Sequence, residues 1–493
     1  MSAENNKETE KRRENSYRSI LKGASFFGGV QVFQVLVNLV RGKFVAMFLG
    51  PEGMGVSSLF ASSANTISQF STFGMNLAFT KEVAENREDP SALALIGRIA
   101  RGMLMLAATA GALFTIIFAP WLSRITFGSD AYAWQFMLLS VMVWLTVAGS
   151  GKMALLQGLH KVKILSKTSV IGAVVGLVVG VPLYYFFGVG GIVPAMIALA
   201  ASTFIFYSWG VHKSIPRHEG PTLWRSRMPV IRKVLSLGLV LMLTSLLTTA
   251  SIYLMNTFIR LFGDMHTVGF YSAANSLTNQ YAGVVFMAMS MDYFPRLAAV
   301  GDDKRMFDSV VNRQIEIVAL IAAPAVILMI ATSPLIIKLL LTDEFLVVTP
   351  LMRWMGLGIL LKALAFPLGY ITFAKNNRKA YLWLEGVACN LLYLVLGMSF
   401  YYWFGLIGLG YAMVTEYAGC ILLYYIVNRR LYRYQFSGKA LRQMGIATVL
   451  AVACFLGAAV SDATLSVTVM ALTFTISAAF SFLRLRKLIR TKE

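Results

Sequence analysis

The feature of this sequence that most restricts its fold is a succession of long apolar runs, each about as long as a lipid bilayer is thick. A helix needs about 20 apolar residues to cross the hydrocarbon core of a bilayer, and about fourteen segments reach that length. Since lipid offers the backbone no hydrogen bonds, such segments fold as helices. We predict membrane spans near residues 20–49, 57–80, 96–118, 132–150, 164–187, 189–210, 235–260, 268–291, 310–331, 346–374, 380–403, 405–428, 440–459 and 463–484.

The composition agrees with a chain whose surroundings are mostly lipid. Of its 493 residues, 57% are apolar and 14% are charged, and its mean hydropathy is +0.67. The net charge of +21 does not indicate nucleic acid, because the basic residues stand in short clusters between the apolar runs and form no continuous basic face. Such clusters are typical of signals that orient membrane spans.

The residue types that usually hold metals or cofactors show no functional spacing. The four histidines are scattered through the predicted loops, and the sequence contains no glycine-rich phosphate loop and no nucleophile motif. Cys389, Cys420 and Cys454 lie inside apolar runs without disulfide or metal spacing, so we interpret them as structural. We therefore expect neither a metal nor a cofactor.

The distribution of basic residues predicts the orientation of the chain. When the loops are assigned alternately to the two sides, most of the 44 lysines and arginines fall on the side of the N-terminus. By the positive-inside rule, both termini are then cytoplasmic. The opposite side and the mid-span positions hold only Arg41, Lys43, Arg124, Arg260, Lys338, Arg353 and Lys362.

Two segments recur at nearly the same offset, which indicates an internal repeat. The stretch 184–191 reappears 217 residues later as 401–408, and at an offset of 214 residues Asn65 of span 2 falls on Asn279 of span 8. We predict an all-α integral membrane fold with two six-helix halves in the same orientation and two additional C-terminal helices. Parallel repeats of this kind place a substrate site between the halves.

This repeat divides the chain into five parts. The halves are separated by a linker rich in basic residues, and a polar tail precedes the first of them. The predicted parts are a cytoplasmic N-terminal tail (1–18), the first half (19–210), a basic cytoplasmic linker (211–234), the second half (235–428), and the two additional helices with a basic tail (429–493).

Polar side chains follow one face of several predicted spans. The spacing by three and four residues brings four polar side chains of span 1 onto one helical face, and span 2 and the repeat-related spans 7 and 8 carry similar stripes. Lipid cannot satisfy such groups, so they either hold helices together or line a cavity. These polar residues are Gln31, Gln34, Asn38, Ser62, Asn65, Gln69, Asn76, Asn256, Asn275 and Asn279.

Charged residues within the spans favour the cavity, because a charge near mid-membrane costs roughly 2.5–3.5 kcal/mol even on the lenient insertion scale. Cations outnumber Glu385 and Glu416, and a positive cavity attracts an anion such as phosphate. Two alternatives stay open. Lys43, Arg260 and Arg353 either line the cavity or extend to the outer interface. Glu416 either pairs with Lys362 or carries a coupling proton or sodium ion. The candidate cations are Arg41, Lys43, Arg260, Arg353 and Lys362.

At the end of span 1 the chain reads Arg41-Gly42-Lys43, followed by the turn Leu49-Gly50-Pro51-Glu52-Gly53-Met54-Gly55. This segment, together with the two-times-six organisation and two further helices, resembles the Wzx-type O-antigen and oligosaccharide flippases. These form the polysaccharide transporter family of the multidrug, oligosaccharidyl-lipid and polysaccharide exporter superfamily. The resemblance covers essentially the whole chain.

The resemblance implies a transporter that moves an undecaprenyl-diphosphate-linked glycan from the cytoplasmic to the outer leaflet of a bacterial inner membrane by alternating access. It implies that spans 1, 2, 7 and 8 line a central cavity and that spans 13 and 14 form a groove for the lipid tail. Arg41 matches a cavity arginine of the family, whereas Arg260 matches only by its repeat position and Lys362 is assigned on physical grounds. Expected partners are membrane lipids, a glycan polymerase and a chain-length regulator, with no nucleic acid.

Three other functions compete with this interpretation. A drug antiporter of the same superfamily would need acidic residues in spans 1, 2, 7 and 8, where the sequence offers only Asp292 at the cytoplasmic end of span 8. A glycan polymerase would need a large outer loop with catalytic groups, and the longest outer loop, near 332–346, holds only Lys338, Asp343 and Glu344 as charged residues. A membrane scaffold would leave the polar stripes and the buried arginine without a purpose.

Overall fold

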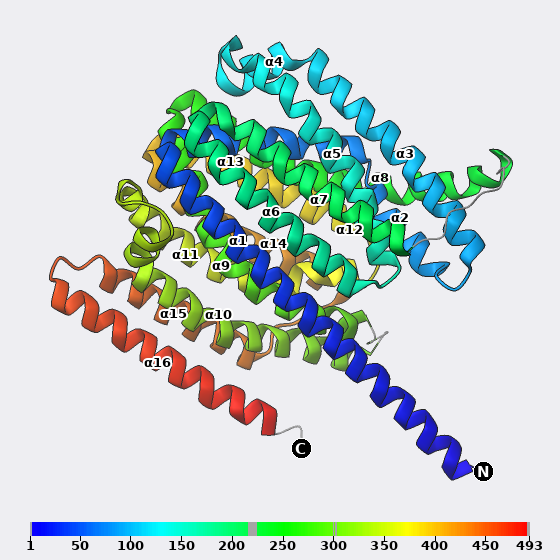
Figure 1. Ribbon diagram of the computed structural model, residues 1–493. Coiled ribbons are helices and arrows are strands. Elements are labelled where there is room, and N and C mark those ends of the chain that lie inside the picture. The colour runs from blue at the N-terminus through cyan, green and yellow to red at the C-terminus, as the bar shows by residue number, and fades with distance from the viewer. Residues whose placement is uncertain (1, 215–223, 299, 301–302, 491–493) are drawn as a thin grey trace.

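The computed structural model describes the backbone of residues 2–214, 224–298, 300 and 303–490. Side chains are described from Val32 on, except at several positions within 224–241 and 281–298 and at 488–490. All secondary structure in these residues is helical. The helices run roughly along one common direction, and the beginning of α1 and the end of α16 lie toward the lower part of Figure 1.

The first half of the chain comprises seven α-helices and two short 3₁₀ turns within the described residues. They are α1 (Ser2–Thr72), α2 (Met75–Glu85), α3 (Pro90–Ile117), α4 (Ala119–Phe127), η1 (Asp130–Tyr132), α5 (Ala133–Gly158), α6 (Val162–Phe187), η2 (Gly188–Gly191) and α7 (Ile192–Ser214). Much of the predicted linker, residues 215–223, lies outside the described residues.

The second half begins with α8, which starts at Trp224, inside the predicted linker, and the two additional helices follow this half. Its elements are α8 (Trp224–Phe262), α9 (Met265–Ala298), α10 (Lys304–Leu340), η3 (Asp343–Val348), α11 (Thr349–Ala374), α12 (Arg378–Tyr381), η4 (Leu382–Ala388), α13 (Cys389–Phe404), η5 (Gly405–Ile407) and α14 (Gly408–Tyr432). The additional helices are α15 (Gly438–Ala458) and α16 (Ala463–Arg490).

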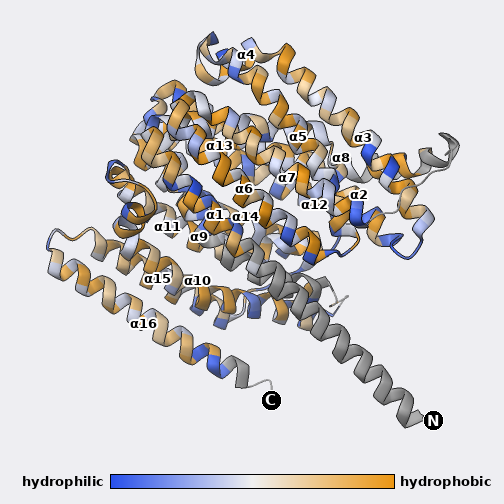
Figure 2. Ribbon diagram, in the orientation of Figure 1, coloured by the Kyte–Doolittle hydropathy of each residue, from blue (hydrophilic) through white to orange (hydrophobic). Residues whose placement is uncertain are grey.

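These elements form fourteen spans within the described residues. Ten stretches are long and apolar enough to cross a membrane, and three of them, Val32–Thr72, Val162–Ser214 and Arg378–Tyr432, each contain two successive spans. α9, which is 34 residues long, supplies the remaining one. Where Figure 2 colours them, the long helices are mostly hydrophobic, and hydrophilic residues gather near helix ends, for example around α2 and in the last coloured part of α16. The predicted fold class is confirmed.

A glycine with positive φ separates the two spans in each of those three stretches. Gly50, Gly188 and Gly405 have φ of 63°, 56° and 61°, a conformation that costs glycine little because it has no Cβ. Gly188 and Gly405 are the repeat-related pair, and a 3₁₀ turn begins at each of them. The turn therefore recurs in the structure at the predicted offset.

Two predicted spans are less regular than the sequence indicates. Span 2 is interrupted at Phe73 and Gly74, which both have positive φ, and α2 continues it. The break lies where span 2 meets α8, because a Cβ on Gly74 would stand 2.1 Å from the Gly238 carbonyl oxygen. In span 11, a π-helix, η4, precedes the regular α13.

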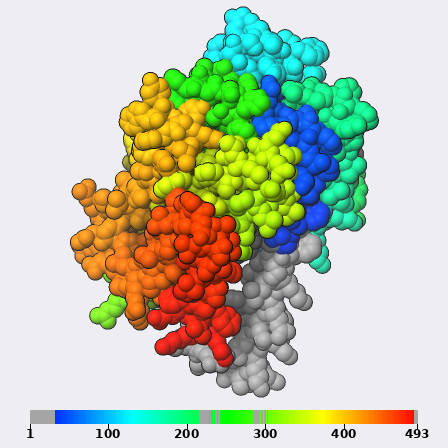
Figure 3. Space-filling model, turned by 90° about the vertical axis from the view of Figure 1, so that its left-hand side faces the viewer, coloured from blue at the N-terminus to red at the C-terminus, as the bar shows by residue number. Residues whose placement is uncertain are grey.

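The two halves contact each other mainly through α1, α8 and α9, while α16 packs on α15 and α10 at the periphery. In Figure 3, α16 forms a red ridge on the surface, with α15 in orange beside it. Each half also has its own core, such as the cluster of α10, α11 and α15 around Ile327 and Leu364. The additional helices thus extend the second half and lie away from the contact between the halves.

Two glycines bring the halves into close contact near the Gly50 turn, where the start of span 2 crosses α9. A Cβ on Gly55 would stand 2.2 Å from the Met265 carbonyl oxygen, and a Cβ on Gly269 only 1.8 Å from the Pro51 carbonyl oxygen. These two glycines are 214 residues apart, so repeat-related positions meet each other. Beside them, Glu52 lies 3.8 Å from His266. We call this contact the glycine crossing.

Next to the glycine crossing, Asp264 precedes α9 in the loop between the spans. Its carboxylate accepts hydrogen bonds of 2.7 Å from the hydroxyl and from the backbone amide of Thr267. These bonds hold the pKa of Asp264 below its ordinary value. The carboxylate is therefore charged at neutral pH and stabilises the start of α9.

Candidate transport cavity

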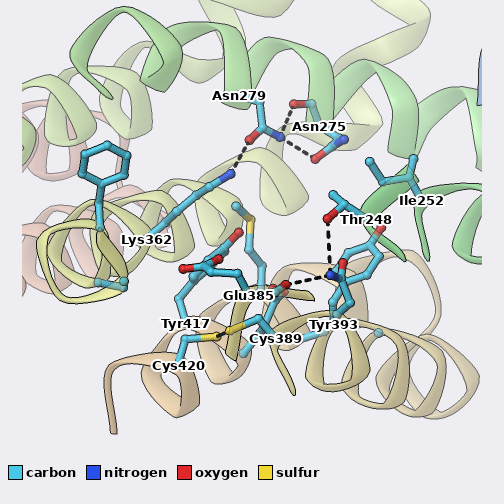
Figure 4. Close-up of a pocket in the computed structure, with 18 of the residues that line it drawn as sticks. Thr248, Ile252, Asn275, Asn279, Lys362, Glu385, Cys389, Tyr393, Tyr417 and Cys420 are labelled. Carbon is cyan, nitrogen blue, oxygen red and sulfur yellow. Dashed lines mark hydrogen bonds between the residues drawn. The ribbon is translucent and has the colours of Figure 1, made fainter. Parts of the chain in front are cut away.

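A cavity of about 690 Å³ lies within the second half, between α8, α9, α11, α13 and α14 (Figure 4). Spans 7 and 8 contribute to it as the resemblance implies, but its other walls come from spans 10, 11 and 12. None of the described residues of α1 lines it. The site thus differs from a cavity formed by spans 1, 2, 7 and 8.

Lys362 is the one cation among the described residues that line this cavity. It projects from the middle of α11, and its Nζ donates a 3.1 Å hydrogen bond to Asn279 Oδ1 of α9. Asn279 in turn donates to Asn275 Oδ1 at 2.7 Å, as Figure 4 shows. The Lys362 ammonium also lies over the ring of Tyr417, 5.5 Å from its centroid. The structure therefore brings three predicted site residues together.

Both predicted coupling carboxylates line the same cavity. Glu416 of α14 is only 7% exposed, and Glu385 of η4 accepts a 2.7 Å hydrogen bond from the Tyr424 hydroxyl. Each carboxylate interacts electrostatically with Lys362. Gly369 provides the space for Glu385, since a Cβ there would stand 2.5 Å from its Oε1. One cation and two carboxylates thus share a cavity inside the membrane.

The π-helix η4 shapes the wall that carries Glu385. The wider turn changes the backbone hydrogen-bond pattern, and Asn390 Nδ2 donates to the carbonyl oxygens of Glu385 and Gly386, both at 2.9 Å. The same amide lies 3.3 Å from the Thr248 hydroxyl of α8. π-Helical turns are frequent at functional sites, where they redirect side chains.

Several lining residues escaped the sequence analysis. The hydroxyls of Tyr271 and Tyr393 lie 3.0 Å apart, and Cys420 Sγ lies 3.3 Å from Cys389 Sγ. A signal for part of this set exists in the sequence, because three residues of α14 at helical spacing lie beside the predicted carboxylate Glu416. These residues are Tyr417, Cys420 and Tyr424.

Three predicted cations lie outside the cavity, each bonded to a carbonyl oxygen near the C-terminal end of a helix. Lys43 donates to the Leu339 carbonyl of α10. Arg260 Nη2 donates to the Ile125 carbonyl of α4 at 3.2 Å, and Arg353 Nη1 donates to the Ala458 carbonyl of α15 at 2.7 Å. Cations are favourable at such ends because the helix dipole is negative there. These contacts favour a structural role.

Replacing Arg353 with methionine is expected to destabilise the protein without abolishing transport. Its guanidinium joins three helices, because Nε also donates to Ser333 Oγ of α10 at 3.2 Å. Losing hydrogen bonds from a charged donor typically costs about 1.5–3 kcal/mol. We expect a lower melting temperature of the purified protein in detergent, whereas Arg124→Met, which removes an exposed ion pair with Asp130, should change it little. An unchanged melting temperature with lost transport would contradict this role.

Arg41 occupies a different position in the molecule. It is half-buried on α1 and interacts electrostatically with Tyr184 of α6. On the same stripe Gln34 is half-buried and Asn38 is exposed, while the side chain of Gln31 lies outside the described residues. Arg41 therefore lies on the side of α1 that faces α6.

The remaining polar stripe residues divide between helix contacts and exposed positions. Asn256 of α8 donates to Ser58 at 3.3 Å, and Asn76 accepts from Ser150 of α5 at 3.0 Å. These amides hold helices together. Ser62 is buried and bonds the carbonyl of its own helix at Leu59; Asn65 is exposed and Gln69 is half-buried. The side chain of Asp292 lies outside the described residues.

Comparisons with known proteins agree with this architecture. A model of the polysaccharide biosynthesis protein family matches residues 44–350. The chain is also similar to the lipid III flippases of Escherichia coli (strain K12) and Shigella flexneri. Each is 22% identical over 413 residues, which cover 81% of this chain and 95% of the relative.

Solved structures show the same fold. The lipid II flippase MurJ in an inward closed conformation superimposes with a TM-score of 0.70 at 14% identity, covering 94% of this chain and 99% of that one. An inward-facing multidrug resistance transporter of the MATE family and MOP superfamily gives a TM-score of 0.65 at 16% identity, covering 83% and 97%. The predicted resemblance is confirmed at the level of family and fold.

Proposed function

The chain belongs to the polysaccharide biosynthesis protein family, and from this membership we propose that it is a flippase for a lipid-linked glycan. The observation that carries the proposal is the polar cavity inside a fourteen-span bundle, with Lys362, Asn279 and Glu416 in its wall. The similarity to lipid III flippases over most of both chains supports it.

Physical chemistry explains why such a substrate needs a cavity. Each sugar hydroxyl that enters hydrocarbon without a partner costs roughly 4–8 kcal/mol on the cyclohexane scale. An oligosaccharide with several hydroxyls therefore does not cross the bilayer unaided on a useful timescale. A chamber that supplies amide, hydroxyl and charged groups removes most of this cost.

In its specific form, the proposed substrate is an undecaprenyl-diphosphate-linked oligosaccharide repeat unit for an O-antigen-like surface polysaccharide. We assign Lys362 to the diphosphate because it lies in the cavity wall, and Arg41 because it matches a cavity arginine of the family. We place the protein in the bacterial inner membrane with both termini in the cytoplasm. A glycan polymerase and a chain-length regulator are its proposed partners.

Glu416 and Glu385 are the proposed coupling groups. Both act on Lys362, so a proton or sodium ion that binds to the carboxylates would release the Lys362 ammonium to bind the substrate anion. Discharge of that ion to the other side would then favour release of the glycan. This exchange links substrate binding to an ion gradient through charge balance alone.

A second candidate is a drug antiporter, and one observation favours it. Cationic drugs need acidic cavity residues, and the cavity holds two carboxylates, although on spans 11 and 12. Deleting the gene in the native host distinguishes the two functions by the fate of the lipid-linked glycan and by the sensitivity of the cells to dyes. Lipid-linked glycan that accumulates on the cytoplasmic leaflet supports the flippase, whereas normal surface glycan with new sensitivity to cationic dyes supports the antiporter.

Replacing Arg41 with alanine is expected to impair glycan transport while leaving the protein in the membrane. A guanidinium that holds a phosphate contributes about 1.5–3 kcal/mol, which corresponds to a loss of about tenfold to a hundredfold. The measurement is complementation of the deletion strain, scored by surface glycan and by membrane protein level. Arg98→Ala, which removes an arginine on α3, is the matched control. Full complementation by Arg41→Ala would rule out the assignment to the diphosphate.

A further inference from the structure

Two thiols face each other in the wall of the cavity. Cys420 Sγ of α14 lies 3.3 Å from Cys389 Sγ at the first residue of α13, and both residues line the cavity (Figure 4). Both are free cysteines. Disulfide sulfurs lie about 2.05 Å apart, so a movement of little more than about 1 Å would join them.

The thiol pair is connected to a proposed coupling carboxylate through a single side chain. The Tyr424 hydroxyl lies 3.1 Å from Cys389 Sγ and donates a 2.7 Å hydrogen bond to Glu385 Oε1. Tyr424 is only 5% exposed, so its hydroxyl stays close to both groups. A movement of Cys389 Sγ would therefore change the contacts of the same hydroxyl that bonds Glu385.

We propose that Cys389 and Cys420 are an oxidation site, at which a peroxide converts the two thiols into a disulfide that joins α13 to α14 and stops the transport cycle. One thiolate attacks a peroxide oxygen, the O–O bond breaks, and a sulfenic acid and water form. The second thiol then attacks the sulfenic sulfur and displaces water. Two thiols are oxidised to one disulfide, and one peroxide is reduced to two waters.

The disulfide would act on transport in two ways. It fixes the spacing of α13 and α14, so this part of the cavity wall can no longer adjust to the substrate. It also draws Cys389 Sγ away from the Tyr424 hydroxyl, which changes the surroundings of Glu385. Since the cytosol keeps thiols reduced, the dithiol is the resting form, and oxidative stress converts it into the disulfide.

The chain contains its own control, because Cys454 of α15 is fully buried beside the Ile327 carbonyl, away from the pair. Membranes that contain the full-length protein are treated with hydrogen peroxide, remaining thiols are alkylated, and peptides are identified by mass spectrometry. We expect a Cys389–Cys420 crosslink in the wild type and in Cys454→Ser, and none in Cys389→Ser or Cys420→Ser. Alkylation of both pair thiols after peroxide treatment, or a crosslink to Cys454, would overturn the site.

Transport provides the second readout, and this part rests on the proposed function. The quantity compared is the ratio of glycan flipping in peroxide-treated and untreated proteoliposomes. For the wild type we expect peroxide to lower the flipping rate by at least about tenfold, and dithiothreitol to restore it. For Cys420→Ser we expect the treated and untreated samples to flip the glycan at about the same rate. A disulfide that forms without slowing transport would overturn the switch. Absence of flipping in the untreated wild type would instead contradict the proposed function, while the peptide analysis still decides the oxidation site.

Discussion

Lys362→Met is expected to lower glycan transport by about tenfold to a hundredfold, the loss typical of a charged hydrogen-bond donor. Lys362 is the only cation among the described residues of the cavity wall, and its Nζ bonds Asn279 Oδ1. Methionine keeps much of the length of the side chain but removes the charge. The measurement is the rate at which purified protein in proteoliposomes flips a lipid-linked oligosaccharide, and Lys362→Arg should retain much of this activity.

Two further variants separate the possible roles of this charge. Lys152→Met removes a half-buried lysine of α5, one that bonds Ser208 and lies 3.8 Å from the centroid of the Phe204 ring, and it should leave transport intact. Combining Lys362→Met with Glu416→Gln restores the charge balance of the cavity. If Lys362 binds the substrate, or if Glu416 is itself required for coupling, the double variant stays inactive. Recovery of transport in the double variant would show that Lys362 serves only to neutralise Glu416.

The spans and the repeat could be predicted because each depends on residues that are close in sequence. An apolar run of sufficient length forms a helix in lipid whatever its neighbours are. The turns at Gly188 and Gly405 could be located for a similar reason, since a glycine with positive φ ends one helix and starts the next. The 3₁₀ turns that begin at these glycines match at the offset found in the sequence.

The cavity could not be assembled in the same way, because its contacts join residues from distant spans. Lys362 and Asn279 are 83 residues apart, and nothing in either helix alone predicts that they meet. The π-helix that carries Glu385 has no sequence signal comparable to a glycine turn. Contact order, and not hydropathy, therefore limits how far the site can be predicted.

The charges show the same limit most clearly. Hydropathy places Lys43, Arg260 and Arg353 within or near spans, where each is compatible with either a cavity or an interface. The structure gives each of them a main-chain carbonyl acceptor near the end of a helix from elsewhere in the chain. Such acceptors become available only when the helices are packed, so the alternatives could not be separated from sequence alone.

Gly269→Val is expected to prevent the glycine crossing from closing and to reduce transport by at least about tenfold, because closure of each side is a required step of the cycle. Even a Cβ at this position would stand 1.8 Å from the Pro51 carbonyl oxygen, and backbone cannot move aside as a flexible side chain can. Valine adds two methyl groups beyond the Cβ and forces α1 and α9 apart. In the proposed orientation, this variant keeps the outer side open.

Closure can be measured directly with an engineered crosslink. Glu52 and His266 lie 3.8 Å apart beside the crossing, and both side chains are exposed. In a background with the native cysteines replaced by serine, the pair E52C and H266C should crosslink readily when the crossing is closed and much less with Gly269→Val. Gly102→Val is the matched control, since a Cβ there meets no atom within 4 Å. Undiminished crosslinking in Gly269→Val would show that the helices accommodate the side chain, and that tight glycine packing is not what seals this end of the bundle.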